Sequence, residues 1–349
     1  MNVQRVLLAR PRGFCAGVQM AIKALTWMVR VFEPPVYCYH EIVHNQVVVD
    51  RFRELGVVFV DDIAEVPDGA PVMLSAHGTA PDLVEEAKAR CGVVVNAVCP
   101  LVTKVHHELK VRAGKGYSVL YVGHRGHDEA IGTMAVAPDA VHLLENEDDV
   151  DGVGELEGPV ALLAQTTLSH DEWGGIVERA KRKYPDLWMP GRSDLCFATT
   201  NRQAALRQIA GKADAVVVIG SANSSNTVAL TKVAAASGAT RVIRVNQASE
   251  LPDDLCGVVA VTAGASAPEE LVSEVLAKLA PSAGTTLVEV VDEDEYFPPP
   301  RELREVLRAV SALAGLAFGL PPEGGGPLDG DRSVEASEVL AELAGQNIR

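Results

Sequence analysis

The chain has 349 residues, of which 48% are hydrophobic and 22% are charged, and its 47 acidic against 31 basic side chains give a formal net charge of −16. This length and composition predict two or three globular domains and exclude a disordered or fibrous protein. The negative charge argues against a protein that binds nucleic acid or an anionic membrane surface, although local donors can still hold a small phosphorylated substrate.

The sequence contains no apolar run that approaches the ~18 residues of a membrane span. The apolar run after the first five residues is too short for a signal peptide. We therefore expect a cytoplasmic protein that has no membrane or nucleic-acid partner. That compartment would keep cysteines reduced.

One local pattern repeats along the chain: a short apolar strand, a polar or glycine-rich turn, and then a helix. We expect strands at 3–9, 72–75, 93–98, 119–122, 160–164, 215–219 and 258–262. The clearest helices run to about residue 31 and over 82–90 and 101–112, and further helices follow the turns after 160–164, 215–219 and 258–262. Near-continuous apolar strands that alternate with helices predict an α/β protein with parallel sheets covered on both faces.

The last part of the sequence, from about residue 316, differs from the rest. It is rich in Gly, Pro and acidic residues from position 321 onward. This composition predicts a disordered tail over 316–349, with a short helix near 334–344. We assign no chemistry to this segment.

Three of the six cysteines follow strand ends, where ligands bind in open parallel sheets. Cys15, Cys99 and Cys196 are separated by intervals of about one small α/β unit. Three cysteines without a fourth are typical of a 4Fe–4S cluster with one open iron, which can bind a substrate oxygen and pass electrons to it. The alternative is three buried structural thiols. The remaining cysteines lie within a strand, at a helix end and before a strand (Cys38, Cys91 and Cys256).

Several histidines also occupy turns after predicted strands or lie near them. His44, His77 and His127 are candidates to donate hydrogen bonds to phosphate oxygens, and His124 lies close to His127. Glu129 follows His127 by two residues and is a candidate proton donor. On sequence alone, a first-turn acid that interacts with the helix dipole is the more common explanation of such a residue.

A second polar group precedes the predicted helices of the C-terminal half. Ser224, Ser225 and Asn226 follow one strand, and Ser266 follows the next. Free N–H groups and the dipole at a helix N-terminus favour an anion there. Capping of the helix is the usual role of Ser and Asn at such positions, and the two roles are compatible.

These segments, in this order, resemble the 4-hydroxy-3-methylbut-2-enyl diphosphate reductases, a family of isoprenoid biosynthesis in the methylerythritol phosphate pathway. The resemblance runs from about residue 9 to 305. It rests on PRGFCAGV at 11–18, HEIVHN at 40–45, SAHG at 75–78, CPLVTKVH at 99–106, GHDEAIGT at 126–133, QTTLS at 165–169, CFATTNRQ at 196–203, NSSN at 223–226 and TAGASAP at 262–268.

The resemblance implies three pseudo-equivalent α/β domains around a central iron–sulfur site. They would span residues 14–98, 99–195, and 1–13 together with 196–315. Cys15, Cys99 and Cys196 would hold one 4Fe–4S cluster with an open iron. The implied reaction is a two-electron reductive dehydroxylation that yields isopentenyl and dimethylallyl diphosphate.

The resemblance also implies roles for the polar residues. The diphosphate would be bound by His44, His77, His127, Thr166, Ser224, Ser225, Asn226 and Ser266. Glu129, with Thr166, would deliver a proton to the substrate hydroxyl, and His127 would lie near the reacting end.

Electrons would come from a ferredoxin or flavodoxin, and the protein would be a monomer or homodimer.

The chain departs from the family pattern at Asn96, Val98 and Gln46, where the family has Asp, Thr and a basic residue. The first two changes alter the surroundings of Cys99, which can tune the cluster potential and mark a divergent paralog. Two other functions use the same cysteines: a cluster-dependent dehydratase, which needs no electron donor, and a non-catalytic iron–sulfur redox sensor, which needs neither Glu129 nor the phosphate-binding set.

Overall fold

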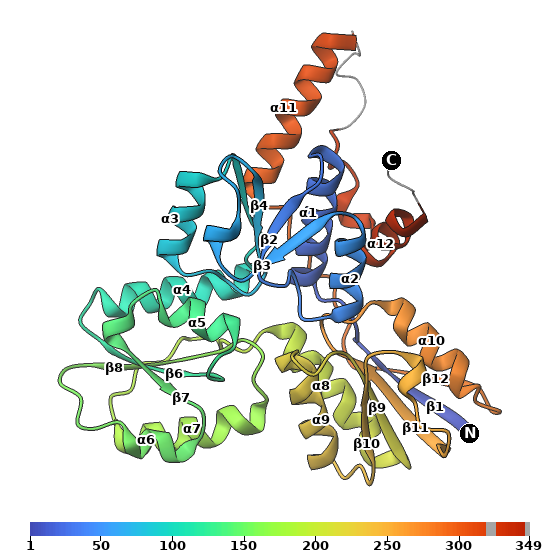
Figure 1. The fold of residues 1–349 in the computed structure, drawn as a ribbon. Helices are drawn as coiled ribbons and strands as arrows, with labels where there is room; N and C mark the ends of the chain where they lie inside the picture. Colours follow the sequence, from blue (N-terminus) through green and yellow to red (C-terminus); the bar gives the residue numbers. More distant parts are fainter. Residues whose placement is uncertain (319–325, 346–349) are drawn as a thin grey trace.

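The computed structural model describes residues 1–318 and 326–345, and it contains three parallel sheets, each covered by helices (Figure 1). The α/β class predicted from the strand and helix pattern is confirmed. The strands of each sheet lie within one of the three ranges 14–98, 99–195, and 1–13 with 196–315. We propose these ranges as the boundaries of a first, second and third unit.

The sheet of the first unit has four strands in the order β3-β2-β4-β5. They are β2 (Val36–Tyr39), β3 (Val57–Val60), β4 (Pro71–Leu74) and β5 (Val93–Asn96), with helices α1 (Ala16–Val31), α2 (Gln46–Glu54), α3 (Pro81–Arg90) and a 3₁₀ turn at Ile63–Glu65. Apolar residues of α1 and of the later helix α11 (Arg301–Phe318) form one core with this sheet. Val60, Val72 and Leu74 face a second core, which includes Ala87 of α3.

The second unit has the strand order β7-β6-β8. Its elements are α4 (Pro100–Ala113), β6 (Ser118–Val122), α5 (Asp128–Met134), a 3₁₀ turn (Pro138–Ala140), β7 (Val141–Leu144), α6 (Glu147–Gly152), β8 (Val160–Ala164) and α7 (His170–Lys183). Every residue of β8 is buried, as expected for a strand covered on both faces.

The third unit has five strands in the order β10-β9-β11-β1-β12. Its elements are β1 (Asn2–Arg10), α8 (Phe197–Ile209), β9 (Ala215–Ile219), α9 (Ser225–Ala236), β10 (Val242–Val245), β11 (Cys256–Ala263), α10 (Glu269–Leu279) and β12 (Thr285–Glu289), with 3₁₀ turns at Ala210–Lys212 and Ala248–Glu250. The first strand of the chain therefore lies inside the sheet of the last unit. Val6 of β1 pairs with Val259 of β11 on one side and with Thr285 of β12 on the other.

The C-terminal segment contains the short helix that the sequence predicts near residues 334–344. Helix α12 (Ala336–Gly345), preceded by a 3₁₀ turn at Asp331–Ser333, packs on α1 (Figure 1). Two contacts hold this segment against α1: Leu340 is buried in the core around α1, and the buried ammonium of Lys23 lies 3.0 Å from the Asp331 carboxylate. Residues 319–325 and 346–349 of the predicted tail lie outside the described part.

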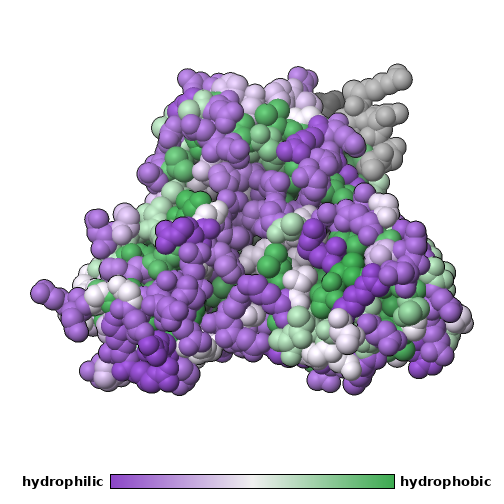
Figure 2. All heavy atoms as spheres, turned by 60° about the horizontal axis from the view of Figure 1, so that its bottom comes forward, coloured by the Kyte–Doolittle hydropathy of each residue, from purple (hydrophilic) through white to green (hydrophobic). Residues whose placement is uncertain are grey.

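The surface is mostly hydrophilic, as the charge of the sequence predicts. In the view of Figure 2 hydrophilic residues cover most of the three lobes, and apolar residues form separate patches on each lobe. Among the described residues, no helix combines the length and the apolar character that crossing a membrane requires.

Candidate active site

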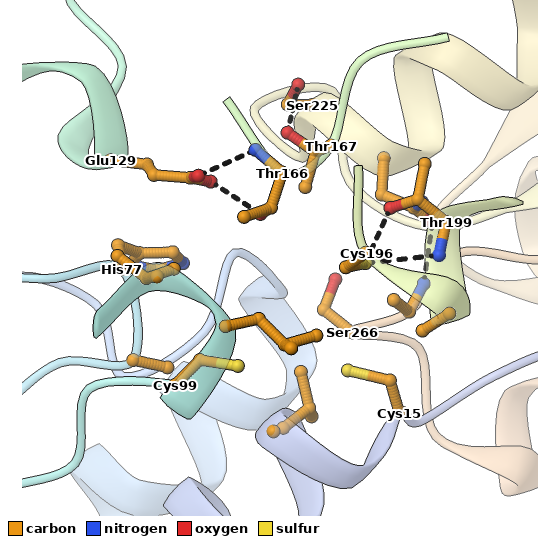
Figure 3. A pocket seen from close by; sticks show the side chains of 18 of the residues that line it. Cys15, His77, Cys99, Glu129, Thr166, Thr167, Cys196, Thr199, Ser225 and Ser266 are labelled. Carbon is orange, nitrogen blue, oxygen red and sulfur yellow. Dashed lines mark hydrogen bonds between the residues drawn. The ribbon is translucent and has the colours of Figure 1, made fainter. Parts of the chain in front are cut away.

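The three cysteines that follow strands occupy the same position in their units, the N-cap of a helix. Cys15 caps α1, Cys99 caps α4 and Cys196 caps α8. All three line one cavity at the meeting point of the units, and their side chains lie around a common space in Figure 3. A helix N-terminus stabilises negative charge, so each sulfur lies where a helix dipole would support an anionic metal ligand.

Cys15 lies close enough to Cys99 and Cys196 to oppose the ionisation of both. Burial raises the pKa of Cys196 to about 12, and the neighbouring Cys15 adds to this effect. Burial also raises the pKa of the Cys99 thiol, again with a contribution from Cys15. None of the three forms a disulfide. A bound cation stabilises neighbouring thiolates against this repulsion, so the donor set of three cysteines suits an iron–sulfur group.

Gly17 leaves space beside the sulfur atoms. A Cβ atom on this residue would lie 2.8 Å from Cys99 Sγ and 3.9 Å from Cys15 Sγ. Apolar side chains complete this part of the cavity, among them Val18, Leu101, Val102, Phe197 and Phe297. The wall that carries the thiols is therefore shaped for a bulky group and has few competing polar atoms.

We expect Gly17→Ala to lower the iron content of the purified protein, because the added methyl group overlaps the Cys99 sulfur. The matched control is Gly174→Ala in α7, since a Cβ atom there meets nothing within 4 Å. Anaerobic iron and sulfide quantification of both variants measures the effect. Equal iron content in the two variants would show that the space over Gly17 is not needed.

Glu129 lies on another wall of the same cavity and has a specific partner. Its Oε1 accepts a hydrogen bond of 2.7 Å from the Thr166 backbone N–H, and its Oε2 accepts one of 2.9 Å from the Thr166 hydroxyl (Figure 3). Burial raises the pKa of Glu129 to about 7, although the two bonds from Thr166 act in the opposite direction. A carboxyl group with this pKa can donate and accept a proton near neutral pH.

The raised pKa of Glu129 makes stability depend on pH in a predictable direction. The native carboxyl keeps its proton at pH values where the unfolded one, with an ordinary pKa of 4.5, has lost it. The free energy of unfolding therefore falls as pH rises from about 4.5 through 7, by up to about 3 kcal/mol from this group. We expect Glu129→Gln, which stays neutral, to lose less stability than the wild type between pH 5 and pH 8 in denaturant titrations at equal iron content. An equal loss would contradict the buried, raised-pKa carboxyl.

A cluster of imidazoles lies near Glu129. The rings of His44 and His77 stack with centroids 3.8 Å apart, and the ring of His127 meets that of His44 edge-on at 5.2 Å. Burial lowers the pKa of His127 to about 4 and that of His77 well below its ordinary value. Within the described part of the chain, His44 Nε2, His77 Nδ1 and His127 Nε2 are buried and have no hydrogen-bond partner.

The hydroxyl and amide groups predicted from the C-terminal half line the same cavity. Ser224 caps α9, and its hydroxyl accepts from the Thr227 N–H. The Ser225 hydroxyl accepts a hydrogen bond of 2.9 Å from Thr167, and Ser266 donates one of 2.9 Å to the carbonyl of His44. The last contact joins the third unit to the first.

Asn226 has a supporting role in this arrangement. Its amide oxygen accepts from the Ala265 N–H at 3.0 Å, and its amide nitrogen donates to Thr199 Oγ1 at 3.3 Å. Thr199 in turn contacts the Cys196 sulfur through its N–H at 3.2 Å and its hydroxyl at 3.0 Å. Asn226 therefore connects the hydroxyl group set to one of the cysteines.

The structure thus brings every predicted site residue to one cavity, which they line. His124 lies apart, in a neighbouring cavity with Glu172 and Lys232. Sequence reasoning did not single out three neighbours of the site: Thr167, Thr199 and Asp128. Thr199 lies three residues after Cys196, the spacing at which an N-cap side chain meets a helix N–H. This spacing could have identified Thr199 from the sequence.

Comparison with known proteins agrees with this geometry. A family model described as LytB protein matches residues 6–280. The 4-hydroxy-3-methylbut-2-enyl diphosphate reductase of Rhodopirellula baltica is 46% identical over 310 residues, which cover 87% of this chain and 97% of that protein. The enzyme of the same name from Acidothermus cellulolyticus is 44% identical over 313 residues, which cover 88% and 92%.

The chain belongs to the LytB family. The solved structure of the E-1-hydroxy-2-methyl-but-2-enyl-4-diphosphate reductase from Plasmodium falciparum superimposes with a TM-score of 0.85 at 32% identity, covering 89% of this chain and all of that one. A second reductase structure matches with a TM-score of 0.59 at 27% identity, covering 79% of this chain and 99% of that one. The predicted family is confirmed, and LytB membership implies an iron–sulfur cofactor.

Two of the departures from the LytB pattern lie beside Cys99. The Asn96 side-chain oxygen accepts a hydrogen bond of 3.1 Å from the Val98 N–H, the same type of contact that an aspartate makes at this position. The Val98 side chain has no hydroxyl, so it forms no hydrogen bond with its surroundings. Asn96 therefore preserves the local turn, whereas Val98 removes a polar group next to the thiol.

The third departure, Gln46, lies at the start of α2. Its backbone N–H donates to the Ser221 hydroxyl at 3.2 Å, and its side chain donates to Asp50 at 2.7 Å. Gln46 is exposed and does not line the cavity. Its side chain is thus directed along its own helix by Asp50.

Proposed function

We propose that this LytB protein reduces 4-hydroxy-3-methylbut-2-enyl diphosphate to isopentenyl diphosphate and dimethylallyl diphosphate. The observation that carries the proposal is the shared cavity: three N-cap thiols on one wall, the buried acid Glu129 on another, and beside them a set of hydroxyls and three imidazoles with unpartnered nitrogens. A redox group, a proton donor and an anion-binding set are the three requirements of this reaction.

Cys15, Cys99 and Cys196 are proposed to hold one 4Fe–4S cluster with one iron that no cysteine binds. When bound, such a cluster would pass the two electrons of the reduction from the external donor to the substrate, one at a time, and would provide a Lewis-acidic iron. The apolar side chains around the thiols exclude water from this part of the cavity, which protects the reactive centre.

The diphosphate is proposed to be bound by the polar set. The nitrogens of His44, His77 and His127 that have no partner in the described structure can each donate a hydrogen bond to a phosphate oxygen. Thr166 and the side chains Ser224, Ser225, Asn226 and Ser266 complete the pocket. Helix α9 begins at Ser225 and directs its N-terminal N–H groups toward this pocket, which favours an anion. A net charge of −16 makes such local donors necessary.

Glu129 is proposed to be the proton donor to the substrate hydroxyl. Its carboxyl, with a pKa of about 7, can give up a proton near neutral pH, and the Thr166 hydroxyl links it to the cavity. In the balanced reaction the C–O bond breaks, the hydroxyl takes one proton and leaves as water, and two electrons with a second proton form the new C–H bond. The position of that C–H bond decides between the two products.

The proposal extends to the partners. We propose a ferredoxin or flavodoxin as electron donor, a cytoplasmic location, and a monomeric or homodimeric state. The donor must deliver electrons one at a time to the cluster, which both protein classes can do.

An anaerobic assay with reduced methyl viologen tests the reaction. We expect both diphosphate products from the wild-type holoenzyme, with consumption of two electrons for each product molecule. Absence of product from protein with full iron and sulfide content would refute the proposal. Loss of water without electron consumption would instead identify a dehydratase.

A further inference from the structure

Arg202 is a fully buried charged side chain to which the proposed reaction assigns no role. It lies in α8, six residues after Cys196, and its exposed fraction is 0%. A buried arginine destabilises a protein unless its charge is paired and its N–H groups are hydrogen-bonded. The partners of Arg202 therefore indicate what the side chain is there to hold.

The guanidinium group joins the two turns that carry Cys15 and Cys196. Its Nε and Nη2 atoms donate to the carbonyl of Gly13 at 3.1 and 2.8 Å, and Nη2 also donates at 3.3 Å to the carbonyl of Phe14, the residue before Cys15. Its Nη1 atom donates at 2.9 Å to the carbonyl of Ala198, two residues after Cys196. One planar group thus fixes the distance between the backbones of the two turns.

Glu293 holds the guanidinium group in this position. Both of its carboxylate oxygens lie 3.0 Å from Arg202 Nη1, and Oε1 also accepts a hydrogen bond of 3.0 Å from the Asn201 side chain. Glu293 lies in the connection from β12 to α11, outside any helix or strand. Because the pair is buried, removal of this carboxylate would leave the charge of Arg202 uncompensated.

The turn before Cys15 is also the place where the chain passes from the third unit into the first. The Gly13 N–H donates to the carbonyl of Ala263 at 3.2 Å, and the Cys15 N–H donates to that of Ala265 at 3.1 Å, both at the end of β11. Helix α1, which Cys15 caps, packs in the core of the first unit. Contacts from β11 and from Arg202 therefore hold Cys15 against the third unit, which also carries Cys196.

We propose that Arg202 is a positioning residue that fixes Cys15 relative to Cys196 and so retains the cluster. This role rests on the proposed function, in which both cysteines hold the same cluster. The groups behind a metal ligand must keep it within about 0.5 Å of the required geometry. A lysine at this position keeps the positive charge, but its single nitrogen cannot reproduce the contacts that the three nitrogens of arginine make.

The test follows iron release and unfolding in the same sample. Anaerobic holoenzyme is mixed with a ferrous-iron chelator in moderate urea, while absorbance reports iron and far-UV circular dichroism reports the helices. We expect Arg202→Lys to release iron at least about tenfold faster than the wild type, as when a metal ligand loses an outer partner. Arg207→Lys is the matched control and should release iron at the wild-type rate, since Arg207 is exposed on the same helix and pairs with Asp171.

Leu206→Ala separates positioning from general stability. Leu206 is fully buried in the same helix and belongs to the core of the third unit, and it does not line the cavity of the thiols. Its truncation destabilises the protein through lost packing. We expect Leu206→Ala to lose iron only as its helices unfold, whereas Arg202→Lys should lose iron before they unfold.

A second variant keeps the test decisive if Arg202→Lys does not fold. Glu293→Ala alters a connection between elements, leaves Arg202 unpaired, and should also release iron before the helices unfold. Iron release that only follows unfolding in each of these variants that folds would overturn the role of Arg202. Wild-type protein that binds no iron and sulfide would instead refute the proposed function, and the role of Arg202 with it.

Discussion

Glu129→Gln is expected to reduce turnover by about 10²–10⁴-fold in the methyl viologen assay while the iron content stays at the wild-type level. Glutamine has nearly the same shape, and its side-chain oxygen can still accept from the Thr166 N–H, so the cavity wall is preserved. What the variant lacks is an ionisable proton at the position where the substrate hydroxyl must be protonated.

The matched control for this variant is Glu147→Gln. Glu147 is also a first-turn acid, in α6, but it is exposed and remote from the cavity. If Glu129 served only to stabilise its helix through the dipole, both variants would behave alike and retain activity. Wild-type turnover in Glu129→Gln would remove the proton-donor role from the proposal.

Replacing any one of Cys15, Cys99 or Cys196 by alanine is expected to remove most of the bound iron and all measurable turnover. Each of these residues caps a different helix at the same cavity, so no neighbouring cysteine can replace a lost one. Mutation of a residue that only hydrogen-bonds to a metal ligand typically costs about 10–100-fold in metal affinity or activity. Loss of a ligand itself should cost at least as much. Anaerobic iron and sulfide quantification provides the measurement.

The other three cysteines supply controls of graded burial. Cys38 is fully buried in the core of the first unit, Cys91 is partly buried at the end of α3, and Cys256 is exposed. Alanine at Cys38 is expected to cost about 1 kcal/mol of stability through lost packing without loss of iron. Equal iron loss in both sets of variants would refute the assignment of the ligands.

The strands that the sequence predicted correctly are the ones with buried faces. The interior strand β9 is apolar throughout and occupies Ala215–Ile219, the range expected. The edge strand β12 was missed because four of its five residues are exposed, so it shows no apolar run or alternation. Strand β5 ends at Asn96, before the predicted residue 98, because the Asn96 side chain binds the Val98 N–H and competes with the sheet.

The sequence predicts those site residues that follow strand ends or belong to a family motif. The position of the three cysteines after strands follows from sequence order, and their meeting in one cavity follows from the topology of parallel sheets. The burial of Glu129 could not be read from sequence, because it depends on Thr166 of another loop. Asp128 was missed for the same reason: the histidines that face it come from a different unit.

The position of β1 sets the order of events while the protein is being made. Among the described strands β1 is synthesised first, yet its neighbours β11 and β12 are complete only at Ala263 and Glu289. At about 5–20 residues per second, the N-terminal strand waits many seconds for the sheet it belongs to. Cys15 follows this strand directly, so the nascent chain cannot present all three thiols in their final places until nearly all of it has been synthesised. We therefore expect iron and sulfide to be inserted late in synthesis or after it, once β1 has paired with β11.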